Sequence, residues 1–156
     1  YLQAGDFIAD RAVVVTKEEE YQLIDAEGEN YLLEGYDQVW PTADNLWLVE
    51  KENKYGAINA EGAVQIPLLF DELQTPSEGF AVYRIENAWG YLRIADNTQL
   101  VPPAYPLVWP FHNGLARVAT RRGITMVDTT GKEIFIPRYT DMRDLENGLI
   151  PVQVYR

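Results

Sequence analysis

Short apolar runs recur along the chain, separated by polar turns. The first three are residues 12–15, 21–24 and 31–33, and all are rich in β-branched, aromatic or leucine side chains. Runs this short, partly alternating between apolar and polar positions, are typical of β-strands, because an amphipathic helix needs a longer stretch with a helical spacing. The pattern therefore predicts an all-β chain.

The strand pattern repeats at a fixed interval. Landmarks separated by 34 or 35 residues include Gly79, Gly114 and Gly148; Tyr21-Gln22, Tyr55-Gly56 and Trp89-Gly90; and Pro67, Pro102 and Pro137. Self-similarity at such a period is the signature of a stacked repeat architecture. We expect a single β-repeat domain over residues 1–156, with units at about 7–42, 43–76, 77–110 and 111–144 and a partial unit at 145–156.

Turn chemistry inside each unit predicts a three-stranded antiparallel meander. The segments Asp25–Gly28, Asn59–Gly62 and Asp128–Gly131 each place an Asp or Asn three residues before a glycine, which suits a type I turn continuing into a residue with positive φ. A proline is expected to end the third strand, because it cannot donate to a ladder. A short link then leads to the next unit. One such meander cannot bury its apolar face alone, so the units must stack.

These motifs resemble the WG-repeat family. Residues 77–110 carry the fullest set: Gly79-Phe80-Ala81, Trp89-Gly90-Tyr91 and Val101-Pro102-Pro103-Ala104-Tyr105. The fourth unit adds Gly114-Leu115-Ala116-Arg117-Val118 and Thr130-Gly131-Lys132, and it has Arg122-Gly123 where the third has Trp-Gly. The resemblance covers nearly the whole chain. It implies a non-catalytic module of the kind found in bacterial proteins, often in the cell envelope.

The expected framework positions are the aromatic and glycine residues of the second strand: Tyr21, Tyr55, Gly56, Trp89, Gly90 and Gly123. We interpret their aromatic rings as core packing. The first meander strand occurs five times and the second four times. The first repeat already has its own first strand, so the fifth copy of that strand, at residues 148–152, is not needed to complete it. This count favours an open, twisted array over the alternative, a small closed propeller-like ring.

The net charge of −11 excludes the usual nucleic-acid binders, because an acidic chain is repelled by phosphates. The charge is also unevenly distributed. Residues 1–80 hold 17 acidic and 4 basic side chains, whereas residues 81–156 hold 7 and 9. This asymmetry indicates either a solvated surface or a polar molecule whose ends attract a partner or each other. There are no cysteines, and no apolar stretch is long enough for a transmembrane helix.

No motif for catalysis, a cofactor or a metal emerges. The acidic candidates Asp25, Glu27, Asp44, Asp71, Asp96 and Asp128 mostly fall at turns, where Asp serves local backbone hydrogen bonds. The single histidine, His112, lies in a link and has no nucleophile motif to serve. A hydrolase working through scattered carboxylates is the remote alternative.

The candidate binding residues are Trp40, Trp109, Arg121 and Arg122. The two tryptophans each precede a proline in a link, 69 residues apart, where an indole either plugs the next unit or forms an exposed stacking platform. The hypotheses are a non-enzymatic module for protein binding or self-assembly, with a periplasmic or cell-envelope location favoured, or a glycan-binding module that uses the tryptophans.

Overall fold

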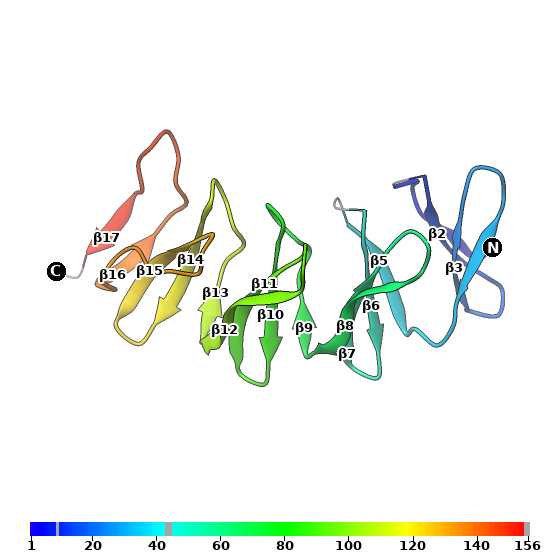
Figure 1. The fold of residues 1–156 in the computed structure, drawn as a ribbon, viewed down its shortest axis with the longest axis horizontal. Coiled ribbons are helices and arrows are strands. Elements are labelled where there is room, and N and C mark those ends of the chain that lie inside the picture. The colour runs from blue at the N-terminus through cyan, green and yellow to red at the C-terminus, as the bar shows by residue number, and fades with distance from the viewer. Residues whose placement is uncertain (9, 43–44, 155–156) are drawn as a thin grey trace. The chain divides into compact units, whose positions relative to one another are not determined.

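The computed structural model describes residues 1–8, 10–42 and 45–154, and every helix or strand assigned in them is a β-strand (Figure 1). The strands form four antiparallel sheets, and none of these sheets closes on itself within the described part of the chain. The prediction of an all-β repeat built from open antiparallel meanders is confirmed. By its contacts the chain divides into two compact parts, each longer than one sequence repeat. From here on we call Tyr1–Leu73 unit 1 and Gln74–Arg156 unit 2.

Unit 1 contains two four-stranded sheets. The first has the order β1-β2-β3-β4 and consists of β1 (Gln3–Ala4), β2 (Ala12–Val15), β3 (Tyr21–Ile24) and β4 (Asn30–Leu33). The second has the order β5-β6-β7-β8 and consists of β5 (Gln38–Pro41), β6 (Trp47–Lys51), β7 (Lys54–Ile58) and β8 (Val64–Phe70). Both sheets therefore follow the order of the chain.

The remaining strands form a four-stranded and a five-stranded sheet. The third sheet consists of β9 (Glu72–Leu73), β10 (Phe80–Ile85), β11 (Ala88–Arg93) and β12 (Thr98–Tyr105). The fourth consists of β13 (Leu107–Val108), β14 (Leu115–Thr120), β15 (Gly123–Asp128), β16 (Tyr139–Met142) and β17 (Val152–Val154). In both sheets, strands adjacent along the chain are neighbours in space.

Each sheet begins with a strand that the sequence did not predict, because the links are strands and not loops. In the second sheet Trp40 pairs with Leu48, so the link after the first meander becomes the edge of the next one. In unit 2, the turns after these link strands contain Glu78-Gly79 and Asn113-Gly114, whose φ values are all positive. Two consecutive positive φ angles define a type I′ turn, which matches the twist of the strands it joins.

The predicted turns between the second and third meander strands are confirmed. The amide of Gly28 donates to the carbonyl of Asp25, and φ at Gly28 is 86°. The Asp25 side chain in turn accepts a hydrogen bond from the Glu29 amide at 2.8 Å. The turns at Asn59 and Asp128 repeat this arrangement, with i to i+3 bonds of 3.0 and 2.9 Å.

The prediction that proline ends the third strand is wrong. Pro67 lies inside β8, and Pro102 and Pro103 lie inside β12, at bulges. In the third sheet Trp89 pairs with Tyr105 and Tyr91 pairs with Val101, so two steps along β11 correspond to four along β12. A bulge frees residues from the ladder, and a proline without an amide donor is tolerated there.

Each unit has its own hydrophobic core, shared by its two sheets. In unit 1 the cluster joins Leu23 and Leu33 of the first sheet to Trp47 and Ile58 of the second. In unit 2 the buried residues come from both sheets and from the segment between β13 and β14: Val82, Tyr91, Val101, Val108, Phe111, Ala116, Val118 and Val127. Neither sheet of a unit could bury these side chains alone, as expected for stacked repeats.

Candidate functional site

Trp40 lies beside a surface hollow of unit 1. Its side chain is 37% exposed and stacks on the ring of Tyr55, with the centroids 6.1 Å apart and the planes 13° from parallel. The hollow has a volume of about 210 Å³, and its polar lining includes Gln3, Asp6 and Gln38. An exposed indole beside amide and carboxylate groups is a surface on which a ring-shaped polar ligand can stack and form hydrogen bonds.

Tyr21 forms another wall of this hollow. Its hydroxyl donates to Oε1 of Gln38 at 3.2 Å, which connects the first sheet to β5. The hydrogen bond fixes the position of the Gln38 amide next to Trp40. The sequence identified Trp40 as a candidate but missed Gln38 and Asp6, because the first comes from the unpredicted strand β5 and the second from the segment after β1.

Trp109 is placed differently from Trp40. The guanidinium of Arg117 lies over its ring at 4.8 Å from the centroid, and Arg117 is itself held by Asp144 at 3.0 Å. The carbonyl of Trp109 accepts a hydrogen bond of 2.6 Å from the buried hydroxyl of Tyr91. The indole is half-buried, so Trp109 joins the third and fourth sheets and does not present an open ring.

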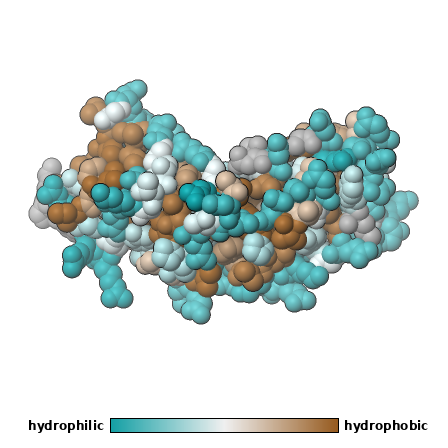
Figure 2. All heavy atoms as spheres, viewed as in Figure 1, coloured by the Kyte–Doolittle hydropathy of each residue, from teal (hydrophilic) through white to brown (hydrophobic). Residues whose placement is uncertain are grey.

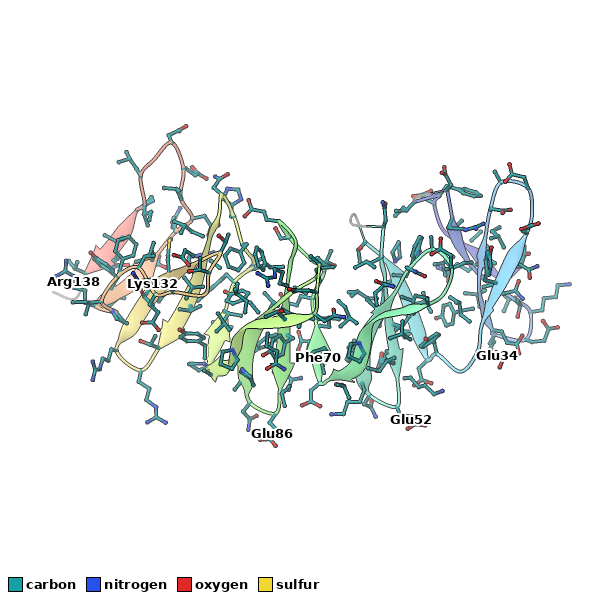
Figure 3. All side chains as sticks on the ribbon, viewed as in Figure 1. Glu34, Glu52, Phe70, Glu86, Lys132 and Arg138 are labelled. Atoms are coloured by element: carbon teal, nitrogen blue, oxygen red, sulfur yellow. The ribbon has the colours of Figure 1, made fainter. Side chains whose placement is uncertain are left out.

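Arg121 and Arg122 form the exposed turn between β14 and β15. They occupy the same place as the turn residues of the two preceding hairpins, where Glu52 and Glu86 lie at the ends of the hairpins in Figure 3. Arg121 also borders a hollow of about 510 Å³ with Asn87 and Tyr105. This hairpin turn therefore carries an acidic residue in the second and third sheets and two basic residues in the fourth.

Strand pairing does not place Gly123 at the position of Gly90. In register, Tyr83 pairs with Gly90, and the corresponding Val118 pairs with Thr125, so Thr125 is the counterpart of Gly90. Gly123 pairs with Thr120 next to the hairpin turn. The distance from Gly90 to Gly123 is close to the repeat period, so the sequence suggested that the two are equivalent. Only strand pairing shows that Thr125 occupies the position of Gly90.

Gly56 and Gly90 do occupy equivalent buried positions, and each lies against a bulge carbonyl. A Cβ on Gly90 would be 2.4 Å from the carbonyl oxygen of Val101, and a Cβ on Gly56 would be 2.5 Å from that of Ile66. Their aromatic neighbours Tyr55 and Trp89 are half-buried, and Trp89 packs against the core of unit 2.

Two buried hydroxyl groups donate to backbone carbonyls of the returning segments of unit 2. The Tyr83 hydroxyl donates to Val101 at 3.1 Å, and burial raises the pKa of this phenol to about 12. In the fourth sheet the buried Thr125 hydroxyl donates to Phe135 at 2.8 Å. These polar contacts fix the returning segments against the strands that precede them.

The acidic candidates serve turns and ion pairs. Burial tends to raise the pKa of Asp25, but the hydrogen bonds from Arg11 and from the Glu29 amide outweigh it and lower that pKa. Hydrogen bonds from Arg93 and from the Thr98 amide lower the pKa of Asp96. Asp71 forms an ion pair with Lys54, and Asp128 accepts from the hydroxyl and amide of Thr130. Asp44 lies outside the described residues.

Asp25 and Glu27 border a polar hollow of about 440 Å³ in unit 1, together with Asp10, Arg11 and Glu61. Arg11 bridges to Asp25 at 2.7 Å, so one cation already neutralises part of this cluster. Within the described ranges, no three histidine or acidic side chains converge closely enough to hold a metal ion.

His112 is exposed, and its backbone pairs with Leu115 across the turn at Asn113-Gly114. The backbone at His112 is therefore placed by this turn. No helix in the described part of the chain is long and apolar enough to span a membrane.

The C-terminal end of unit 2 exposes a group of large apolar side chains, which we call the C-terminal surface. Its members, with their exposed fractions, are Ile134 36%, Phe135 39%, Ile136 79%, Leu149 73%, Val152 46% and Val154 54%. Figure 2 shows hydrophobic residues gathered at this end of the unit. The sequence indicated a leftover strand here, but the strand begins at Val152, and Gly148 lies in the preceding turn.

Comparisons with known proteins agree with the repeat. The family model described as "WG containing repeat" matches residues 55–89, 89–120 and 125–155. Among solved structures, the chain is similar to the one titled "Crystal structure of HIRA(644-1017)", with a TM-score of 0.44 and 10% identity. That alignment covers 79% of this chain and 48% of the other, so this chain spans about half of its length. No curated protein matched the chain.

Proposed function

Because this chain belongs to the WG containing repeat family, we propose that it is a non-enzymatic module that binds another protein or a copy of itself. The observation that carries the proposal is the C-terminal surface, where six large apolar side chains are exposed within residues 134–154. Groups of exposed apolar side chains are typical of sites of protein interaction. A repeat scaffold presents such a surface without needing any reactive group.

The charge distribution supports a protein partner. Unit 1 contains sixteen acidic and four basic residues, whereas unit 2 contains eight and nine. A partner with a basic surface would be steered toward unit 1, and nucleic acids would be repelled by it. The second unit is nearly neutral, so its apolar surface can approach partners of either sign.

The positions of the carboxylates support a module without catalysis. A general acid–base pair needs two carboxyl groups that face a shared cavity with different protonation behaviour. Here Asp25, Asp96 and Asp128 each accept turn amides, and the first two also form ion pairs. Their hydrogen-bonding capacity is used in holding the turns together.

The test is sedimentation of the purified chain over a wide range of protein concentration and salt, followed by cross-linking in extracts of the source cells. We expect association that depends on the C-terminal surface, so that Leu149→Asp weakens it about tenfold or more, while Val64→Asp, on an exposed valine of unit 1, leaves it unchanged. A monomer under every condition, together with no cross-link to any partner from this surface, would contradict the proposal.

Glycan binding at Trp40 is the second candidate function, favoured by the open indole and the polar hollow beside it. Aromatic faces with adjacent hydrogen-bonding groups suit sugar rings, which have apolar faces and polar edges. Trp109→Ala is the matched control for Trp40→Ala, since Arg117 covers Trp109. We expect only the Trp40 variant to lose binding on a glycan array. A wild-type chain that binds no glycan would end this candidate.

We further propose the bacterial cell envelope as the location of the module. The support is the resemblance of its repeats to the WG-repeat family, which implies a module of bacterial proteins, often in the cell envelope. Cell fractionation with an antibody against the chain tests this, and recovery of the native protein only with cytosolic markers would contradict it.

A further inference from the structure

In unit 2, the hollow of about 510 Å³ lies at repeat positions that carry an ion pair in unit 1. That ion pair joins Lys54, the first residue of β7, to Asp71, the residue after β8. Strand pairing places Ala88 at the position of Lys54. It also places Pro106 at the position of Asp71, and both replacements line the hollow. Two charged side chains are thus replaced by two short apolar ones, which leaves the space that we call the Pro106 hollow.

A carboxylate at the same repeat position holds a hairpin turn in unit 1. Asp37 precedes β5, and its Oδ2 accepts a hydrogen bond of 2.7 Å from the amide of Glu52, in the turn between β6 and β7. The equivalent residues in unit 2 are Pro106 and Arg121, because β13 pairs with β14 in the register in which β5 pairs with β6. Proline has no side-chain oxygen, so this turn lacks the acceptor that the second sheet provides.

Arg121 therefore keeps its donors unused. Among the described residues, neither its amide nor its guanidinium forms a hydrogen bond or an ion pair. The turn itself is held by the Thr120 hydroxyl, which accepts from the Arg122 amide at 3.1 Å and donates to the Gly123 carbonyl at 2.8 Å. The amide and the guanidinium of Arg121 are thus offered from a turn whose shape is already fixed.

The other lining residues determine what can accompany a carboxylate in the Pro106 hollow. Ala104 and Tyr105 contribute apolar surface, and the Tyr105 hydroxyl donates to Glu133 at 2.6 Å. The side-chain amide of Asn87 has no hydrogen bond within the described ranges, so it can bind a peptide carbonyl. The volume lies within the range of about 300–1,000 Å³ that is common for ligand sites, so it holds more than one side chain.

The charges around the Pro106 hollow favour an anionic ligand. Arg121 is the one charged side chain among its lining residues. The turn Arg121-Arg122 is basic where the hairpin turns of the second and third sheets have Glu52 and Glu86 (Figure 3). Unit 2 contains eight acidic and nine basic residues, so its overall charge does not repel an acidic ligand.

We propose that the Pro106 hollow binds an acidic segment of a partner protein, whose Asp or Glu carboxylate takes the place of the missing Asp side chain. The carboxylate accepts from the Arg121 amide, as Asp37 accepts from Glu52, and pairs with the guanidinium. Hydrogen bonds to an ionised acceptor are among the strongest in proteins. A small apolar side chain next to the acidic one packs on the apolar wall. None of these residues belongs to the C-terminal surface, so the proposal goes beyond the proposed function and does not depend on it.

The test titrates the 156-residue chain with two blocked pentapeptides, in which Asp or Glu stands between pairs of alanines, and follows the amide resonances by NMR. We expect saturable shifts at Arg121 and Ala104, and binding that weakens as salt is added. The same peptides with Asn or Gln at the centre should bind at least tenfold more weakly. Arg121→Gln should weaken binding of the acidic peptides about fivefold or more. Arg143→Gln is the matched control, since Arg143 is an exposed arginine of the same unit outside the hollow, and it should leave binding unchanged.

Pro106→Asp tests the geometry without a partner. The new carboxylate should accept from the Arg121 amide, which moves that amide resonance downfield. It should also abolish binding of the acidic peptides, because their place is then filled. Pro106→Ala is the matched control, since it removes the proline ring without adding a carboxylate, and it should still bind the peptides. The dispersion of the amide spectra shows that both variants keep the fold.

Three results would overturn the acidic partner. They are the absence of saturable shifts with both acidic peptides, equal binding of the uncharged peptides, and tighter binding of inorganic phosphate at the same turn. Self-association that Pro106→Asp abolishes would also overturn a separate partner, because a second copy would then supply the carboxylate. Leu149→Asp, which alters the C-terminal surface, should leave peptide binding unchanged. Failure of this inference and failure of the proposed function are thus read from different variants.

Discussion

At the scale of single residues, Gly56 and Gly90 determine how the third strand of each meander can run. The carbonyl of Ile66 or Val101 occupies the space where a side chain would begin. The bulge that brings these carbonyls inward contains Pro67 or Pro102, which needs no hydrogen bond of its own. Glycine is therefore required here by close approach, and its φ angle is not the reason.

Replacing Gly90 by alanine should lower the free energy of unfolding by about 2–3 kcal/mol, because the new methyl group overpacks the bulge. Gly56→Ala should behave in the same way. Urea unfolding followed by circular dichroism measures both, with Gly5→Ala as the control, since Gly5 is exposed and its nearest contact is 3.4 Å away. A loss equal to that of the control would refute the assignment.

Burial of Tyr83 and Tyr91 should make the fold sensitive to alkali. Burial raises the pKa of Tyr83 to about 12, and it raises the pKa of Tyr91 as well, whereas phenols in the unfolded chain ionise near pH 10. The folded pKa values are the higher ones, so their contribution to stability is complete below about pH 10 and is lost as the pH rises toward 12.

Ultraviolet absorbance of tyrosinate during a pH titration tests this, with circular dichroism recorded in parallel. We expect some tyrosines to ionise only as the fold is lost, and Tyr83→Phe to flatten the fall of stability between about pH 10 and 12. Complete ionisation of all tyrosines in a folded chain would count against it.

At the scale of elements, side chains connect one turn to the next within unit 2. The Glu78 carboxylate accepts hydrogen bonds from the amides of Asn113 and Gly114 at 2.7 and 2.9 Å. The Asn113 side chain then donates to the Leu145 carbonyl at 2.9 Å. Type I′ turns direct their amides outward, so a carboxylate from the preceding turn can hold two of them at once.

Glu78→Gln should lower the free energy of unfolding of unit 2 by about 1 kcal/mol, since it weakens two charge-assisted hydrogen bonds. Glu146→Gln is the matched control, because it also lies beside a turn of the same unit and is exposed. Chemical denaturation resolves the difference. Equal midpoints for the two variants would show that the contact does not contribute.

The elements show where sequence reasoning succeeded and where it failed. The turns at Asp25, Asn59 and Asp128 were correctly predicted, because an Asp or Asn side chain and a glycine act within four residues. The strand at Trp40 was missed, since its pairing with Leu48 depends on a partner beyond the turn. The shift from Gly123 to Thr125 was missed for the same reason, as register is a property of two strands.

At the scale of the whole molecule, the two units each bury a core of their own, so stability is local. Within unit 2 we expect hydrogen exchange to be fastest in β16 and β17 and slowest in β10, β11 and β14. The reason is that β17 is exposed throughout, whereas the inner strands contain fully buried residues such as Tyr83 and Val118. Native-state exchange by mass spectrometry measures this gradient, and uniform protection would contradict it.

Of the candidate site, the sequence supplied the residue types but not their surroundings. Trp40 and Trp109 look alike in sequence, each preceding a proline, yet one indole is open and the other is covered by Arg117. The guanidinium reaches Trp109 from β14, and nothing in the local sequence of the tryptophan indicates it. Exposure is thus decided by neighbours that only the fold brings together.

The first sheet has Gln22 where the second has Gly56, and its third strand runs in regular register without a bulge or a proline. In the first three sheets, glycine and the distorted return strand are thus present together or absent together. We therefore expect exchange between such repeats to keep these two strands together. An exchange that replaced only one of the two strands would bring a side chain and a backbone carbonyl into the same space. Such a variant would fold poorly.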